Sequence, residues 1–180
     1  MSYPSNILHQ VTKPALYTGG EWNSLVKDWD KTPIRIALSY PDLYEIGMSN
    51  MALPILYELL NSQSDVLAER VYAPWVDMEA VMRTAGIPLF SLESKRPLKD
   101  FDIIGFSLGY ELTYTNVLNM LHLAQIPVLA SERDDSYPVV IAGGSCTHNP
   151  EPMVDFIDFF VIGDGEEILL ELLDSFRDWK

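Results

Sequence analysis

Cysteine is almost absent from this chain of 180 residues, where Cys146 is the single example. One thiol cannot form an internal disulfide. It also excludes a zinc site or an iron–sulfur cluster that several thiolates of this chain would have to hold. Chemistry that depends on a protein-bound cluster therefore cannot take place within these residues alone.

Positive charge is scarce, and long apolar runs are missing. Lys and Arg together number 12 against 26 Asp and Glu, so the formal net charge is −14. An acidic chain of this kind is a poor partner for a phosphate backbone or an anionic membrane surface. No apolar run reaches membrane-spanning length, and no charged leader precedes an apolar stretch. We predict a cytoplasmic protein that contacts neither nucleic acid nor a membrane directly, and no oligomeric state is predicted.

The common phosphate-binding motifs are also missing. No G-x-G-x-x-G follows the first apolar segment, and G-x-x-x-x-G-K-[ST] occurs nowhere. The loop after Tyr40 reads Pro-Asp-Leu-Tyr-Glu, where a flavodoxin phosphate loop would carry Ser, Thr and Gly. Ser107 stands where a phospho-acceptor receiver domain would carry an aspartate. An independent nucleotide- or flavin-binding protein is therefore a disfavoured alternative.

Apolar strand segments alternate with amphipathic helical segments along residues 34–180. We predict strands at 34–39, 66–72, 102–107, 139–142 and 159–162, and helices at 51–60, 75–85, 112–125 and 166–179. This alternation predicts a doubly wound α/β fold with a mainly parallel five-stranded sheet, Rossmann-like and of the flavodoxin type. The runs 139–142 and 159–162 lack polar alternation, which is typical of strands buried on both faces.

Shorter features lie at the edges of this pattern. Gly86 is predicted to cap the carboxyl end of the preceding helix, and residues 88–91 favour a short edge strand. Residues 1–33 are predicted to be an N-terminal extension, with a short amphipathic helix from Trp22 to Trp29. We expect its aromatic residues to anchor it against the main domain of residues 34–180.

Three strand ends carry residues suited to a binding crevice. In an open parallel sheet, ligands bind outside the carboxyl ends of the strands. The residues concerned are Asp42, Tyr44 and Gly47 after the first strand, Ser107 and Gly109 after the third, and Gly143 and Gly144 after the fourth. Small residues here would leave room for a flat or bulky ligand, although a tight turn alone would explain any single glycine.

The same residues carry a resemblance. Asp42-x-Tyr44-x-x-Gly47, Ser107-x-Gly109 and the Gly-Gly pair resemble, in this order, the D-x-H-x-x-G … S-x-L … G-G pattern of cobalamin-binding domains. Residues 143–167 are similar to the GG-x(n)-PE … D-x-x-x-x-G-[ED]-G-E signature of cobalamin-binding-domain radical S-adenosylmethionine (radical SAM) proteins. The segment 17–23 also looks like the start of one uncharacterised subgroup, and the likeness covers nearly the whole chain.

The resemblance implies a non-catalytic, N-terminal cobalamin-binding-like domain. It would hold a corrinoid, or the substrate, with the residues Asp42, Tyr44, Gly47, Ser107, Gly109, Gly143 and Gly144. Radical SAM catalysis needs three closely spaced cysteines for a 4Fe–4S cluster that binds S-adenosylmethionine, and this chain has one. The catalytic domain is therefore expected after Lys180, and this C-terminal domain of the same polypeptide is the expected partner.

Two departures from the cobalamin pattern open alternatives. Tyr44 replaces the histidine that gives an imidazole to cobalt, and a phenol is a poor substitute. A corrinoid would then bind without a histidine from this loop, or His148 would supply one from another loop. Gly109 replaces a leucine, and the bulky Tyr110 and Glu111 follow it. If these side chains and Tyr44 fill the crevice, the domain is a cofactor-free docking platform.

Overall fold

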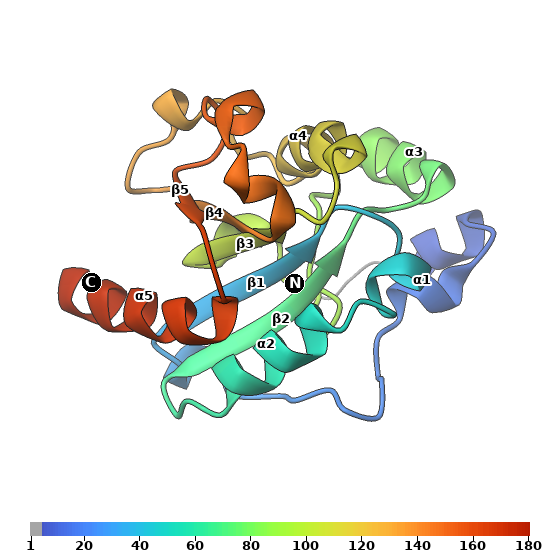
Figure 1. Ribbon diagram of the computed structural model, residues 1–180. Coiled ribbons are helices and arrows are strands. Elements are labelled where there is room, and N and C mark those ends of the chain that lie inside the picture. Colours follow the sequence, from blue (N-terminus) through green and yellow to red (C-terminus); the bar gives the residue numbers. More distant parts are fainter. Residues whose placement is uncertain (1–4) are drawn as a thin grey trace.

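The computed structural model describes residues 5–180, and within them a five-stranded sheet forms the centre of the molecule (Figure 1). Every pair of neighbouring strands is parallel, and the order across the sheet is β2-β1-β3-β4-β5. The strands are β1 (Ile34–Tyr40), β2 (Val66–Tyr72), β3 (Ile103–Ser107), β4 (Val139–Gly143) and β5 (Phe159–Val161). The predicted doubly wound, flavodoxin-like fold is confirmed.

Helices cover both faces of this sheet (Figure 1). On one face lie α2 (Ala52–Asn61) and α5 (Gly165–Trp179), and on the other lie α3 (Val76–Ala85) and α4 (Tyr114–Leu123). Alternate residues of β1 divide between the two cores: Ile36 packs with the first helix pair and Ala37 with the second. The chain moves from β1 outward to β2 and then back to β3, so the topological switch point falls between β1 and β3.

The helix boundaries follow local chemistry. Gly86 adopts the left-handed conformation with φ of 65°, and its backbone N–H donates to the carbonyl of Met82, as predicted for a carboxyl-terminal cap. Glu166 and Glu167 lie in the first turn of α5, where the helix dipole favours negative charge. No helix within residues 5–180 combines the length and apolar character needed to cross a membrane.

Two strand predictions are wrong in part. Residues 88–91 do not join the sheet, and their ladder is limited to an isolated antiparallel bridge between Phe90 and Pro97. Prolines 88 and 97 remove backbone donors, which prevents a longer ladder. β5 is not buried on both faces, because Phe159 is 61% exposed. β5 lies at the sheet edge and pairs only with β4 among the described strands.

The predicted helix from Trp22 to Trp29 is also wrong. Residues 21–28 are irregular, and Trp22 is fully exposed, so it anchors nothing. The backbone N–H of Leu25 donates to Tyr57 Oη at 2.8 Å, a long-range contact in place of a helical bond. Trp29 does anchor the extension, through an edge-to-face contact with Phe101 at 5.0 Å. Residues 1–4 of the predicted extension lie outside the described residues.

The remaining helical segments are short. α1 (Tyr44–Gly47) is one turn in the loop after β1. The 3-10 turns are Ser5–Gln10, Pro14–Tyr17, Trp29–Lys31, Leu98–Asp100, Glu111–Thr113, Ala130–Glu132, Ser145–His148 and Glu151–Met153.

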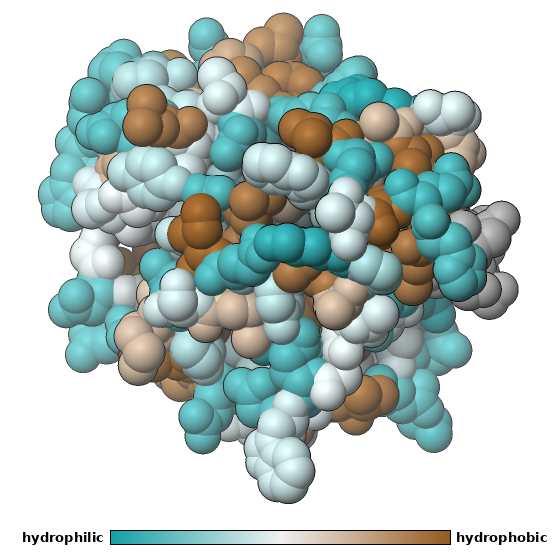
Figure 2. Space-filling view, turned by 90° about the vertical axis from the view of Figure 1, so that its right-hand side faces the viewer, coloured by the Kyte–Doolittle hydropathy of each residue, from teal (hydrophilic) through white to brown (hydrophobic). Residues whose placement is uncertain are grey.

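The carboxyl ends of β1 and β2 point to the right in Figure 1. Figure 2 shows that side of the molecule, where apolar surface lies in separate patches among hydrophilic side chains.

Candidate functional site

A crevice of about 370 Å³ opens at the carboxyl edge of the sheet. Its floor is the face of β1, β3 and β4, and its walls come from α2 and the first turns of α5. We use "the crevice" for this cavity, whose lining includes Ser107, Gly109, Gly143, Gly144, Gly163 and Glu166. Both glycine turns of the sequence, after β4 and after β5, therefore reach one cavity.

Four of the seven residues predicted to bind a ligand line this crevice: Ser107, Gly109, Gly143 and Gly144. Their loops are tied to one another by backbone hydrogen bonds. The N–H of Leu108 donates to the carbonyl of Gly143 at 2.7 Å, and the N–H of Cys146 donates to the carbonyl of Leu108 at 3.1 Å. The rim formed by the β3 and β4 loops is therefore held in one arrangement by the backbone.

Two glycines of this rim differ in what they permit. Gly144 has φ of 109°, and a Cβ there would lie 2.6 Å from the carbonyl oxygen of Leu108. Only glycine allows the two loops to approach so closely. At Gly143 a Cβ would lie 3.7 Å from Cβ of Val161, an ordinary contact. Neither the backbone conformation nor a close neighbour therefore requires glycine at position 143.

Gly105 is a lining residue that the sequence analysis missed. It lies in the middle of β3 and forms part of the floor of the crevice. A Cβ there would lie 3.6 Å from Cγ1 of Ile141, so the sheet does not require a glycine. A glycine inside a buried strand is itself a sign of close approach by another group, and this sign was present in the sequence.

Gly105→Ala is expected to raise the free energy of unfolding by about 0.5–1 kcal/mol, because a glycine inside a strand loses more backbone entropy on folding than alanine. Urea denaturation followed by circular dichroism measures this change. Gly144→Ala serves as the control of opposite sign, since its Cβ would collide with Leu108. Destabilisation by Gly105→Ala would mean that the floor of the crevice is already full.

The three residues predicted in the first loop do not reach the crevice, although Asn50 of the same loop does. Asp42, Tyr44 and Gly47 are not among the residues that line it. Oδ1 of Asp42 accepts from the backbone N–H of Leu43 at 2.7 Å, and Oδ2 accepts from Tyr110 Oη. The hydrogen bond to the Asp42 carboxylate raises the pKa of Tyr110 to about 12. Asp42 therefore connects the loops after β1 and β3 without facing the cavity.

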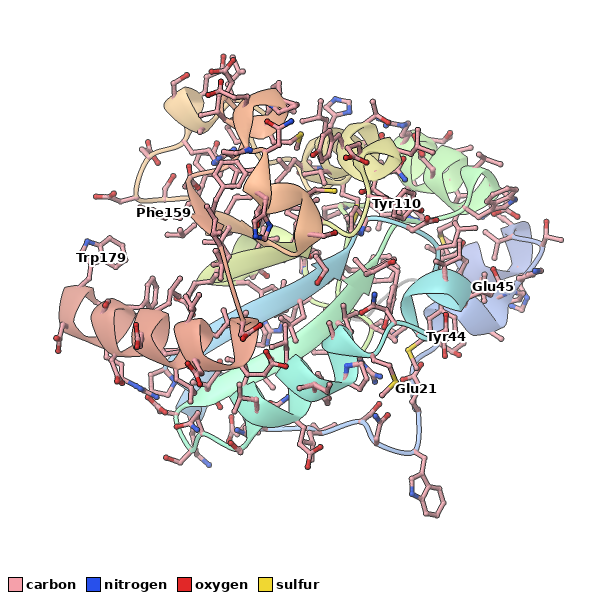
Figure 3. The ribbon with its side chains drawn as sticks, in the orientation of Figure 1. Glu21, Tyr44, Glu45, Tyr110, Phe159 and Trp179 are labelled. Carbon is pink, nitrogen blue, oxygen red and sulfur yellow. The ribbon has the colours of Figure 1, made fainter. Side chains whose placement is uncertain are left out.

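Tyr44, in the place of the cobalamin-binding histidine, is directed toward the N-terminal extension. Its hydroxyl donates to Oε1 of Glu21 at 3.0 Å (Figure 3). Its ring meets that of Tyr72 edge to face, with 5.4 Å between the ring centroids. Burial, followed by the hydrogen bond to Glu21, raises the pKa of Tyr44. Gly47 lies against Tyr72, where a Cβ would be 2.4 Å from Cε1. Tyr44 and Gly47 therefore hold the loop after β1 in place.

The side chains expected to fill the crevice lie elsewhere. Tyr44, Tyr110 and Glu111, all described residues, are absent from its lining, so the filling that the docking-platform alternative assumed does not occur. His148, the alternative cobalt ligand, is exposed in a 3-10 turn, with Nδ1 3.2 Å from the carbonyl oxygen of Ser145. It does not line the crevice either.

A family model described as "Radical SAM proteins, N-terminal" matches residues 52–180. The chain belongs to this family. The match to the radical SAM N-terminal domain includes Ser107, Gly109, Gly143 and Gly144, and it begins after the loop that carries Asp42, Tyr44 and Gly47.

One curated relative of this radical SAM N-terminal domain is an uncharacterized protein of Methanocaldococcus jannaschii. The two are 22% identical over 142 residues, which cover 77% of this chain and 26% of the relative. The chain thus spans about a quarter of the length of the curated relative it matches.

Proposed function

We propose that this N-terminal domain of a radical SAM protein is a corrinoid-binding module. It holds the tail of a cobalamin in the crevice and presents the corrin ring to a catalytic domain in the same polypeptide. The observation that carries the proposal is the open cavity of about 370 Å³ at the switch-point edge of the sheet. Ligands of doubly wound folds bind at this edge.

The size and chemistry of the crevice suit such a tail. Its volume lies within the range of about 300–1,000 Å³ that small-molecule sites occupy. Apolar side chains such as Leu38 and Ile141 form the floor, and Gly105 and Gly143 leave space above it. The Ser107 hydroxyl and the Glu166 carboxylate lie in the lining and can bond the amide groups that a cobalamin carries.

Charge in the lining favours a corrinoid tail over a polyphosphate nucleotide. Among the residues that the structure describes, the lining includes Asp164 and Glu166 but neither lysine nor arginine. A di- or triphosphate would lack cationic partners there. Gly165, the first residue of α5, also lines the crevice, and a helix N-terminus accommodates the single phosphodiester of a cobalamin tail.

The first loop provides no imidazole for cobalt. Tyr44 lies where the cobalamin pattern has histidine, and its hydroxyl is engaged by Glu21. A bound corrinoid supplies a cobalt centre that can carry an alkyl group. The residues of this domain bind and orient the corrinoid. The 4Fe–4S cluster and S-adenosylmethionine belong to the proposed catalytic domain, because this chain has one cysteine.

Titration with hydroxocobalamin tests the proposal. We expect one-to-one binding by calorimetry and an absorbance spectrum without the imidazole-ligated form, because Tyr44 offers a phenol already bonded to Glu21. An imidazole-ligated spectrum that disappears in His148→Ala would move the ligand to the loop after β4. No heat and no spectral change would contradict corrinoid binding and favour the cofactor-free docking platform.

A further inference from the structure

A second cavity, of about 610 Å³, lies along α5 on the same face of the sheet as the crevice. We name it the α5 groove; its lining includes Val139, Phe159, Ile168, Leu172, Phe176 and Trp179. Two large side chains at this groove face water, since Phe159 is 61% and Trp179 is 64% exposed. Figure 3 shows both on the same side of the molecule, toward the carboxyl end of α5. Phe159 and Trp179 are absent from the lining of the crevice, whereas Leu172 lines both cavities.

α5 carries more apolar surface than its contact with the sheet requires. Leu169 and Leu173 are buried against the strands and belong to the core shared with α2. Ile168, Leu172 and Phe176 follow one another at intervals of four residues and line the α5 groove. Residues at this spacing form one stripe along a helix. This second stripe has the pattern of a helix–helix contact.

The α5 groove corresponds to the position of a further helix beside α5 on this face of the sheet. α2 lies on one flank of α5, where a Cβ added at Gly165 would lie 3.6 Å from Leu56. The other flank is the α5 groove, with the sheet as its floor. The connection from β4 to β5 is made by 3-10 turns, and its Met153 and Ile157 pack in the core of the opposite face. Within residues 5–180, that connection therefore leaves β4 and β5 uncovered beside α5.

We propose that an amphipathic helix from the catalytic part of the same radical SAM polypeptide docks in the α5 groove. This inference rests on the proposed function only in assigning a catalytic domain to the same polypeptide. The curated relative supports that assignment, because this chain covers 26% of it. Phe176 and Trp179 lie in the last turns of α5, so a segment that follows α5 has a short path to the groove.

Charge specifies the docking helix further. Glu171 lies in the lining of the groove and is exposed, and the chain has a formal net charge of −14. A helix that places apolar residues toward Phe159 and Leu172 would therefore carry lysine or arginine at its flanking positions, opposite Glu171. A second copy of this chain would instead bring its own excess of acidic residues to the groove.

Cysteine labelling in the full-length protein tests this docking. Ser175 lines the groove and is exposed in this domain, whereas Asp174 is exposed and is not part of the lining. We expect a maleimide to modify S175C about tenfold more slowly than D174C, equivalent to about 1.4 kcal/mol of protection. Mass spectrometry of the α5 peptide locates the label and separates it from other cysteines; Cys146 is buried.

The second part of the experiment adds F159D to the S175C variant and repeats the labelling. Phe159 is mostly exposed, so the charge should displace the docked helix without disturbing the core, and S175C should become as reactive as D174C. Equal reactivity of S175C and D174C without F159D would overturn the docking, as would protection that F159D leaves unchanged. Protection that disappears on dilution together with a dimer would assign the groove to a second copy. Hydroxocobalamin titration of the same sample tests corrinoid binding separately.

Discussion

Replacing Arg70 by methionine is expected to lower the free energy of unfolding by about 3–5 kcal/mol, as measured by urea denaturation. Arg70 is 2% exposed. Its Nε donates to Oε1 of Glu93 at 2.6 Å, and Nη2 donates to Oε2 of Glu21 at 3.2 Å. The guanidinium also lies over the ring of Tyr57, 4.8 Å from its centroid. Methionine preserves much of the volume but leaves the Glu93 carboxylate buried without its hydrogen-bonded ion-pair partner.

The effect of Arg70→Met should depend on pH. Burial raises the pKa of Glu93, and the charge of Arg70 opposes that rise. Removing Arg70 therefore raises the pKa of Glu93 further in the folded state. A carboxyl group with a raised folded-state pKa loses stability as the pH rises through that pKa, and regains it in acid. The deficit of Arg70→Met relative to wild type should be larger at about pH 8 than at about pH 5.

Arg177→Ala is the matched control for Arg70→Met. Arg177 also binds a carboxylate, with Nε 2.7 Å from Oδ2 of Asp65, but its side chain is 32% exposed. An exposed pair of this kind is worth about 1 kcal/mol or less. If Arg70→Met costs no more than Arg177→Ala at neutral pH, the buried ion pairs of Arg70 stabilise the fold no more than an exposed pair does.

The fold could be predicted from the sequence because its elements have local causes. β2 occupies residues 66–72 as predicted, and Gly86 ends α3 as predicted, since apolar runs and a left-handed glycine act within a few residues. The extension could not be predicted in this way. Its backbone is set by Tyr57, Arg70 and Phe101, which are distant in sequence from residues 21–29.

The candidate site was partly predictable for the same reason. The strand-end rule places Ser107 and Gly143 at one edge once the strands are known, and both line the crevice. The direction of Tyr44 depends on Glu21 and Tyr72, so the sequence motif did not reveal it. The α5 groove was missed because the apolar residues of α5 form one broad face in the sequence, whereas in the structure Ile168, Leu172 and Phe176 are only partly buried against the core and also line the groove.

Replacing Gly143 by leucine is expected to weaken hydroxocobalamin binding by roughly 100-fold while the domain remains folded. Gly143 lines the crevice, and its added Cβ would point toward Val161, another lining residue, at a distance of 3.7 Å. The remaining carbons of leucine must then occupy the space proposed for the tail. Overpacking costs up to about 3 kcal/mol, which corresponds to this loss of affinity. Calorimetric titration measures it.

Gly143→Ala is the control that separates the effect of a changed backbone conformation from the effect of added side-chain volume. φ of Gly143 lies outside the left-handed region, and the alanine Cβ would make only an ordinary contact, so binding should stay within a few-fold of wild type. Circular dichroism and urea denaturation are the measurements that test whether both variants are folded. Gly105→Leu repeats the test from the floor of the crevice, on the neighbouring strand. Wild-type affinity in both folded leucine variants would place the corrinoid outside the crevice, because each side chain enters that cavity from a different strand.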